Sequence, residues 1–427
     1  MFKNYIQKKL ERYVVEYFAA HPTVKLVCVT GSVGKTSTKM AAATVLRQQY
    51  RVHVHEGNHN TEISAPLAIL GIPYPSNIKN PLAWRRVFKQ AKQRIAAPAD
   101  VDIIIQELGA DQPGDVQSFG RYLKPDISLV TGVTPEHMEA FGTIDAVAAE
   151  ELSVANFSKM AIINCDDIPP QFAGVLTNPA VFTYGTSQDI AVCSFKSVEF
   201  SLQEGHKGYF IAPDFPDGLP ATLKVVGEHN LRPIVGAVAV AMQLGMAPEL
   251  IVRGAEAIRP VAGRMNILPG VKDSILIDDT YNSSPAAAAA AVRTLAAISA
   301  PQKIAILGSM NELGAVSADE HTKLGQLCRA GEIDWVITIG EEAGKYTGPA
   351  ALANGCFVRS FPDAISAGSF AHSKIERGAV VLAKGSQGGI FAEEALKIML
   401  RSTDDMKKLV RQDPAWLEAK TKFFSKF

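Results

Sequence analysis

The chain has 427 residues, of which 47% are apolar and 20% charged, and its 43 basic side chains balance its 43 acidic ones. This is the composition of a globular protein with sizeable cores. The neutral balance removes the long-range field that would attract a nucleic acid or an anionic membrane, but it allows a local basic pocket for a compact anion. The five cysteines are scattered and no segment is apolar enough to span a bilayer, so we expect a soluble, reduced, cytoplasmic protein.

An amphipathic helix is predicted at the N-terminus, because apolar side chains recur at helical spacing between Phe2 and Phe18. Beyond it, short apolar runs alternate with longer helical patterns. The runs show no polar alternation, which is typical of parallel strands covered on both faces. They occupy residues 25–31, 102–109, 126–133, 160–167, 274–279, 303–308, 334–340 and 378–385.

Two segments depart from this alternation. Residues 73–100 have the pattern of a basic helical insertion between two strands, and residues 190–226 alternate polar and apolar side chains, which is typical of antiparallel hairpins. We place a domain boundary near residue 262, so that residues 1–262 form a nucleotide-type domain and residues 263–427 a doubly wound domain. Ligands bind such sheets at the carboxyl ends of the strands, where polar residues follow nearly every run.

A phosphate-binding loop is the strongest local signal, in the sequence VTGSVGKTST between a predicted strand and a predicted helix. Gly31 and Gly34 let the backbone curl so that its N–H groups point at phosphate oxygens. Lys35 would reach the β- and γ-phosphates, and the hydroxyl of Thr36 would bind Mg²⁺. The strict motif has glycine where this chain has Val29, so the loop is a variant. The predicted ATP or GTP site comprises Gly31, Ser32, Val33, Gly34, Lys35, Thr36 and Ser37.

Further motifs follow the loop in a fixed order: GNHNTEISAPLAIL, QELGADQPGD, TGVTPEHMEAFGT, GEHN, GRM, DDTYNSSP, LGSMNELG and AKGSQ. In this order they closely resemble the Mur ligase family, and DDTYNSSP and NELG resemble its branch that adds D-alanyl-D-alanine to a UDP-muramoyl tripeptide. The resemblance covers roughly residues 25–400. It implies an α/β fold, with a P-loop-type parallel-sheet ATPase domain followed by a Rossmann-like doubly wound domain.

The resemblance also implies an ATP- and Mg²⁺-dependent ligase of cell-wall peptide synthesis. In that family a substrate carboxylate attacks the γ-phosphate of ATP, and the amine of an amino acid or a dipeptide then attacks the acyl phosphate. The implied partners are therefore small molecules or peptides. Charge builds up between phosphate and carboxylate, so cationic groups must bridge them. The implied catalytic residues are Lys35, Glu107, His137 and Arg264.

Matching the motifs residue by residue implies further roles. Glu107 and Thr36 would hold one Mg²⁺, which oxygen ligands suit, and His137 would lie at a second metal. Beyond the phosphate loop, the residues implied to contact the nucleotide are His229 and Asn230 near the adenine, Arg264 at the phosphates and Asp279 at the ribose. The residues implied to contact the acceptor or the amine are Asn58, Asn60, Thr61, Glu62, Tyr281, Asn282, Asn311, Glu312 and Lys384.

One position departs from the family pattern. Family members carry a carbamylated lysine fourteen residues after the histidine, where this chain has Glu151. A carboxylate keeps the charge and the oxygen donors of a carbamate on a shorter side chain. One hypothesis is that Glu151 binds the metal, directly or through water. The alternative is that the second metal site is weakened or lost and that Glu151 is a solvated helix residue.

A second departure concerns the start of the chain. The first predicted strand begins at Lys25, which leaves too short a segment for the domain that holds UDP in the cell-wall branch. The acceptor then lacks UDP, is gripped by residues 73–100, or is held by a protein partner in place of that domain. A solvated helix packed on the sheet is the other interpretation of this insertion. Its predicted cationic face comprises Trp84, Arg85, Arg86, Lys89, Lys92 and Arg94.

Two other functions stay open at this point. One is ligation to a folate-type, lipid-linked or poly-amino-acid acceptor. The other is a degenerate module that binds ATP without ligation, because Glu151 stands where the family has a metal-binding lysine.

Overall fold

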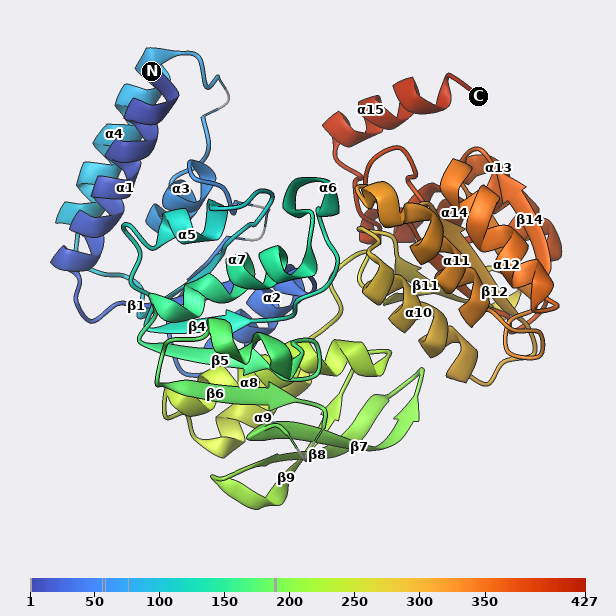
Figure 1. Ribbon diagram of the computed structural model, residues 1–427, viewed down its shortest axis with the longest axis horizontal. Helices are drawn as coiled ribbons and strands as arrows, with labels where there is room; N and C mark the ends of the chain where they lie inside the picture. Colours follow the sequence, from blue (N-terminus) through green and yellow to red (C-terminus); the bar gives the residue numbers. More distant parts are fainter. Residues whose placement is uncertain (1, 56, 58, 76, 188–189) are drawn as a thin grey trace. The chain divides into compact units, whose positions relative to one another are not determined.

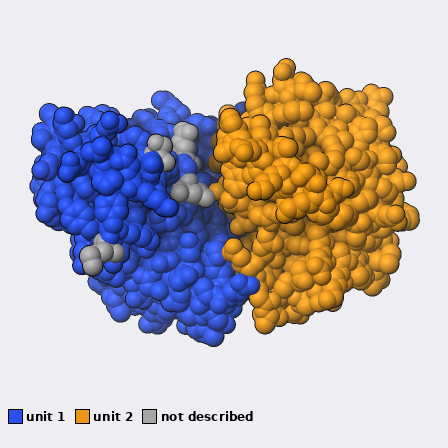
Figure 2. All heavy atoms as spheres, turned by 90° about the horizontal axis from the view of Figure 1, so that it is seen from above, with its two compact units in different colours: residues 1–224, 230–258 blue, residues 225–229, 259–427 orange. Residues whose placement is uncertain are grey.

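Two units make up the computed structural model, which describes residues 2–55, 57, 59–75, 77–187 and 190–427. By the contacts within the chain, the first unit comprises residues 1–224 and 230–258, and the second comprises residues 225–229 and 259–427 (Figure 2). Each unit has its own sheet and its own apolar core.

Within the described residues, the first unit is built on one nine-stranded sheet (Figure 1). Its strands are β1 (Lys25–Thr30), β2 (Val52–Val54), β3 (Ile103–Glu107), β4 (Ile127–Val130), β5 (Met160–Asn164), β6 (Val181–Gly185), β7 (Cys193–Ser201), β8 (Gly205–Ala212) and β9 (Phe215–Leu223). Their order is β2-β3-β1-β4-β5-β6-β7-β8-β9. The strands up to β7 pair in parallel, and the last two pairs are antiparallel. The predicted hairpin region therefore extends the first sheet.

Helices cover both faces of this sheet. They are α1 (Phe2–Ala20), α2 (Lys35–Leu46), α3 (Ser64–Leu70), α4 (Pro81–Ala96), α5 (Asp115–Phe119), α6 (Met138–Phe141), α7 (Ile144–Asn156), α8 (Leu231–Gln243) and α9 (Pro248–Ala257). α2 packs with α8 and α9 on one face, and α3 and α7 cover the other (Figure 1). The double cover explains why the central strands are continuous apolar runs.

The N-terminal helix and the basic insertion form an additional layer, in which α1 packs on α3 and α4 (Figure 1). Two contacts show that the two long helices run parallel. Near the start of α1, the ring centroids of Tyr5 and Phe88 lie 6.4 Å apart, and further along both helices Arg94 lies 5.5 Å from the Tyr17 ring centroid. Trp84 is only 2% exposed. Its predicted place on the cationic face is therefore wrong, because α4 turns the large apolar indole inward, away from water.

The second unit has a six-stranded sheet within the described residues. Its strands are β10 (Asn266–Pro269), β11 (Ile275–Asp279), β12 (Lys303–Gly308), β13 (Trp335–Ile339), β14 (Phe357–Phe361) and β15 (Val380–Lys384). Its helices are α10 (Pro285–Ala297), α11 (Ser317–Leu327), α12 (Gly348–Ala353), α13 (Ala364–Lys374), α14 (Glu393–Met399) and α15 (Pro414–Phe424). The order is β10-β11-β15-β12-β13-β14, and all pairs except β10–β11 are parallel.

Helices α13 and α14 pack on one face of the second sheet, and α10 to α12 pack on the other. The predicted doubly wound α/β fold is thus confirmed. All eight apolar runs are strands, whereas β2, β6, β10 and β14 lie outside both these runs and the predicted hairpin region. β10 and β14 lie at the edges of the second sheet and their side chains are largely half-buried or exposed, so they lack the apolar run that marks an inner strand.

Buried charges tie the C-terminal segment to the second sheet. Glu393, the first residue of α14, is 0% exposed and accepts hydrogen bonds from the guanidinium of Arg411 at 2.8 and 2.5 Å. The ammonium of Lys420, on α15, lies 2.8 Å from the same carboxylate. Arg411 also donates to the carbonyls of Thr280 and Tyr281 at 2.6 and 2.9 Å. The C-terminal segment therefore braces the loop that follows β11.

We expect Glu393→Ala to lower the free energy of unfolding by about 3–5 kcal/mol, because it leaves the cation of Arg411 buried without its anion. Denaturant unfolding measures the change. The control is Glu418→Ala on the exposed face of α15, which should change the free energy by less than about 0.5 kcal/mol. Equal effects of the two substitutions would contradict this account.

Candidate functional site

The predicted phosphate loop is a tight turn between β1 and α2. Gly31 and Gly34 have φ angles of 126° and 82°, in the region that favours glycine. A Cβ on Gly31 would lie 2.2 Å from the hydroxyl oxygen of Thr131, so the loop has no room for a side chain there. That hydroxyl donates to the carbonyl of Val33 at 2.5 Å. The loop is thus held against the residue that follows β4, and the N-terminus of α2 comes directly after it, an arrangement suited to an anion.

Lys35 is a charged group within this loop. Its ammonium donates to the carbonyl of Gly31 at 2.6 Å and lies 3.7 Å from the carboxylate of Glu136. Burial lowers the pKa of Lys35, but the carboxylates of Glu136, Glu151 and Glu107 outweigh it and raise the pKa above its ordinary value. Lys35 is therefore cationic at neutral pH, as the binding of a phosphate group requires.

Glu107 is the last residue of β3, and its side chain contacts α2 and the segment before α3. Its carboxylate, 3% exposed, lies 3.1 Å from the hydroxyl of Thr36 and 3.0 Å from the ammonium of Lys39. The side-chain amide of Asn60 donates to the same carboxylate at 3.5 Å. A carboxylate beside a hydroxyl suits Mg²⁺, which takes few protein ligands and keeps several waters. The pair that the resemblance assigned to one Mg²⁺ is thus brought together.

The rest of the predicted substrate segment does not converge on this point. Asn58 lies outside the described residues. Thr61 is hydrogen-bonded to the first residue of α3, and Glu62 forms an ion pair with a lysine of α1. Among the described members of the segment, Asn60 is the one that reaches Glu107.

Glu151 is buried beside the phosphate loop. It is 2% exposed, and it accepts hydrogen bonds from the backbone N–H of Gly31 at 2.8 Å and from the hydroxyl of Thr30. The alternative that Glu151 is a solvated helix residue is therefore wrong. Burial raises the pKa of Glu151, and the charge of Lys35 opposes that rise. The neighbouring Glu150 points elsewhere and accepts backbone hydrogen bonds at the start of α5.

His137 precedes α6 in a left-handed conformation, with φ of 50°. Its Nε2 atom lies 3.7 Å from the carboxylate of Asp111 and 3.8 Å from that of Glu136. In the described part of the chain, no three histidine, cysteine or acidic side chains lie close enough together to hold a metal ion. The structure thus gathers the residues of the first predicted metal site and does not assemble the second.

Several charged residues around the loop were not predicted from the sequence. The carboxylate of Glu136 forms an ion pair with Lys35 of the loop. Lys39, only 2% exposed, forms an ion pair with Glu107. Arg232, at the start of α8, lies 3.2 Å from Asp166 and 2.8 Å from Asp167, which follow β5. Two signals were present: Lys39 comes one helical turn after the loop lysine, and the two aspartates follow the end of a strand.

In the second unit, a buried lysine engages the predicted ribose residue. Lys384 is 1% exposed, and its ammonium donates to Asp279 at 2.6 Å and to the carbonyl of Asn282 at 3.0 Å. The two residues face each other because β11 and β15 are paired. Burial lowers the pKa of Lys384, and the charge of Asp279 opposes this. The predicted contact of Lys384 with the amine substrate stays a prediction, whereas its support of Asp279 is observed.

Asp278, next to this pair, has a structural role. It is 0% exposed and accepts hydrogen bonds from the backbone N–H of Gly263 at 3.0 Å and from the hydroxyl of Thr280 at 2.6 Å. Burial raises the pKa of Asp278 to about 6. Asp278 therefore joins the loop before β10 to the loop after β11.

Loops from three adjacent strands, β11, β15 and β12, interlock at their carboxyl ends. The side-chain oxygen of Asn282 accepts from the backbone N–H of Gln387 at 3.3 Å. The backbone N–H of Asn311 donates to the hydroxyl of Ser386 at 2.9 Å. Two of the predicted substrate residues are thereby brought to one edge of the sheet, the edge at which open α/β sheets bind ligands.

The remaining predicted residues lie in loops and turns. The guanidinium of Arg264 lies 4.4 Å from the ring centroid of Tyr281, within the range of a cation–π contact. Glu312 is exposed and has a left-handed φ of 64°. His229 and Asn230 belong to a 3₁₀ turn that leads into α8.

Two protein-family models match the chain. The one described as Mur ligase middle domain matches residues 29–241, and the one described as Mur ligase, glutamate ligase domain matches residues 263–387. The UDP-N-acetylmuramoyl-tripeptide–D-alanyl-D-alanine ligase of Bacillus subtilis is 27% identical over 341 residues, which cover 77% of this chain and 65% of that protein. The Escherichia coli ligase of the same name is 26% identical and matches 75% of this chain and 65% of its own length. The chain thus spans 65% of the length of these two relatives.

Solved structures show the same fold. A MurF structure from Acinetobacter baumannii matches with a TM-score of 0.75 and 21% identity, covering 93% of this chain and 80% of that one. MurF from Thermotoga maritima, in complex with ADP, matches with a TM-score of 0.73 and 22% identity over 92% of this chain and 83% of that one. Together with the sheet topologies, these likenesses confirm the predicted fold class.

We expect Gly31→Ala to weaken the binding of tripolyphosphate by about tenfold or more, because a methyl group would collide with Thr131 and distort the loop. Isothermal titration calorimetry measures the affinity. Gly174→Ala is the matched control, since nothing lies within 4 Å of the added Cβ. Equal affinities of the two variants would show that the loop does not bind phosphate in this conformation.

Proposed function

Because this chain belongs to the Mur ligase family, we propose that it is an ATP-dependent ligase that joins a substrate carboxylate to the amine of an amino acid or a dipeptide. The observation that carries the proposal is the meeting of Thr36, Lys39 and Asn60 at the buried carboxylate of Glu107, beside a phosphate loop. The names of the curated relatives support the same chemistry. We place this ligation in cell-wall peptide synthesis in the cytoplasm.

The reaction takes place in two balanced steps. An oxygen of the carboxylate attacks the γ-phosphorus of ATP, and the bond to the leaving ADP breaks. The amine then attacks the acyl carbon, the bond to phosphate breaks, and the amine gives up a proton. Lys35 would neutralise phosphate charge in the first step, and Arg264 would add a cation that cannot lose its proton. Bound Mg²⁺, held by Thr36 and Glu107, would withdraw charge from the phosphate oxygens.

The acceptor and the amine are part of the proposal. The relatives are named for a UDP-N-acetylmuramoyl tripeptide and D-alanyl-D-alanine, and these are our first choice for this chain. The alternatives are a folate-type, lipid-linked or poly-amino-acid acceptor, or ATP binding without ligation. A protein partner that helps to hold the acceptor belongs to the same set of proposals.

We expect ADP release to require both substrates at once, the UDP-muramoyl tripeptide and D-alanyl-D-alanine. A coupled assay for ADP measures it, and mass spectrometry of the product detects the new amide bond. Lys35→Ala should lower the rate by about a hundredfold or more, because the cation at the γ-phosphate is lost. Release that needs a different acceptor would select one of the other ligase classes. ATP binding without ADP release from any pair of substrates would contradict ligation.

Glu151 is central to this mechanism, although it replaces the family's carbamylated lysine. Its carboxylate accepts a hydrogen bond from the backbone N–H of Gly31, which holds one end of the phosphate loop in place. The same carboxylate interacts electrostatically with Lys35 and contributes negative charge at the loop. We propose that this charge does the work of the carbamate, either on a second metal ion or on the loop itself.

We expect Glu151→Ala to lower ligation by about a hundredfold or more, because the loop loses both an acceptor and a charge. Glu151→Gln keeps an acceptor for Gly31 but removes the charge, and it should raise the Mg²⁺ concentration needed for half-maximal rate. Rates measured across a Mg²⁺ series separate the two effects. Glu139→Gln, at an exposed position of α6, is the control. Wild-type turnover in Glu151→Ala would exclude any role in catalysis.

A further inference from the structure

Charge is unevenly distributed over this protein. Residues 1–20 and 73–96, which contain α1 and α4, carry ten basic and two acidic side chains, so this layer has an excess of eight positive charges. The whole chain, in contrast, has a net charge of zero. The second of these segments has no acidic residue at all. The neutral composition, from which we expected no attraction to anionic membranes, therefore conceals a cationic layer.

The charges are concentrated on the outer side of α4. Arg85, Arg86, Lys89 and Lys92 are all exposed, and their spacing of three and four residues places them on one face of the helix. We call these four residues the basic face. Arg94, further along the helix, pairs with an aspartate at 2.6 Å. Among the described residues, no carboxylate forms an ion pair with any member of the basic face.

Apolar side chains lie at the N-terminal end of this layer. Leu82 is 60% exposed, although it lies one turn before Arg86 on the same face. Ile78 is 51% exposed in the preceding segment, and the indole N–H of Trp84 donates to its carbonyl at 2.8 Å. Tyr5 of α1, 56% exposed, lies at the same end, because the two helices run parallel (Figure 1). Exposed apolar side chains thus lie beside the basic face.

We propose that the basic face, together with Ile78 and Leu82, binds the surface of an anionic lipid bilayer. Lysine and arginine attract anionic headgroups, and apolar side chains enter the boundary between headgroups and acyl chains. A nucleic acid would use the charges but would leave Ile78 and Leu82 in water. No helix of the described residues is long and apolar enough to cross a bilayer.

The position of this layer within the first unit adds a reason. α1 packs on α4 and on α3, and the segment just before α3 carries Asn60, which reaches the candidate metal ligand Glu107. The membrane-facing layer and the candidate site therefore belong to one packed body. Attachment of this layer to a bilayer would therefore hold the candidate site near the membrane surface.

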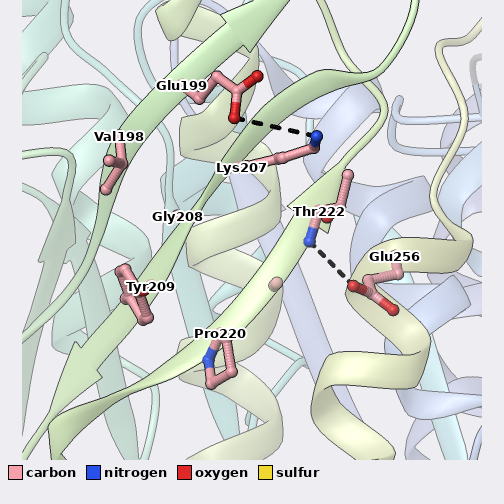
Figure 3. Close-up of a pocket in the computed structure, with 9 residues that line it drawn as sticks. Val198, Glu199, Lys207, Gly208, Tyr209, Pro220, Thr222 and Glu256 are labelled. Carbon is pink, nitrogen blue, oxygen red and sulfur yellow. Dashed lines mark hydrogen bonds and ion pairs between the residues drawn. The ribbon is translucent and has the colours of Figure 1, made fainter.

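Another exposed surface of the same unit does not combine unpaired cations with exposed apolar side chains. The hollow over β7 to β9, with a volume of about 340 Å³, is lined by apolar and charged residues of both signs (Figure 3). There Lys207 lies 3.9 Å from Glu199, and Glu256 accepts from the backbone N–H of Thr222. Its cation is already paired, so the basic face is the stronger candidate for an anionic partner.

Binding to vesicles without ATP or substrates tests the proposal independently of ligation. We expect the protein to cosediment with vesicles of phosphatidylglycerol and phosphatidylcholine at about 0.1 M salt, and to bind pure phosphatidylcholine far more weakly. The variant Arg85→Gln, Arg86→Gln, Lys89→Gln, Lys92→Gln should lose about a hundredfold or more in affinity, because each cation near an anionic surface contributes about fivefold. No binding by the wild type, or binding that this variant retains, would overturn the proposal.

Two further variants separate a bilayer from other anionic partners. The control Arg329→Gln, Lys345→Gln, Lys374→Gln, Lys407→Gln removes the same charge from exposed positions of the second unit, and it should bind vesicles like the wild type. Equal losses in the two quadruple variants would contradict a localised surface. Ile78→Ser with Leu82→Ser should weaken vesicle binding by about tenfold and leave heparin binding unchanged. Equal weakening of both, or tighter binding of a DNA duplex than of vesicles, would overturn the lipid assignment.

Discussion

The buried carboxylate of Glu107 is the constraint around which the first unit's site is built. A carboxylate removed from water is costly unless it is paired and hydrogen-bonded. Lys39 supplies the pairing charge, and Thr36 and Asn60 add polar contacts. These partners come from α2 and from the segment before α3. The buried charge therefore holds the end of β3, the first turns of α2 and the segment before α3 together. The phosphate loop lies between β1 and α2, so its position depends on the contacts that hold α2 against Glu107.

Buried ion pairs hold loops in place in the second unit as well. Asp279 and Lys384 meet at the carboxyl ends of paired strands, and Glu393 holds two cations, of which Arg411 reaches the loop after β11. In each unit the loops at the carboxyl edge of the sheet are thus supported from beneath by buried charges. This organisation explains why a scaffold of parallel sheets can carry a site made almost entirely of loops.

Overall charge was a poor guide to the surface of this protein, because a sum carries no information on position. The carboxylates of Glu107, Glu136 and Glu151 are gathered around the phosphate loop, whereas basic residues gather on α4. Both groupings contribute to the same net charge of zero. The distribution, and not the total, decides which anions the molecule meets and where.

By itself, the sequence determined the strands that are buried on both faces, the phosphate loop and the family, because these depend on local patterns of apolar residues, glycines and motifs. It did not determine the edge strands β10 and β14, whose side chains are too exposed to leave an apolar run. Tertiary structure alone decided that Glu151, and not Glu150, faces the loop, because packing sets the rotation of α7. It alone paired Lys384 with Asp279, 105 residues away, because only the folded sheet makes β11 and β15 neighbours.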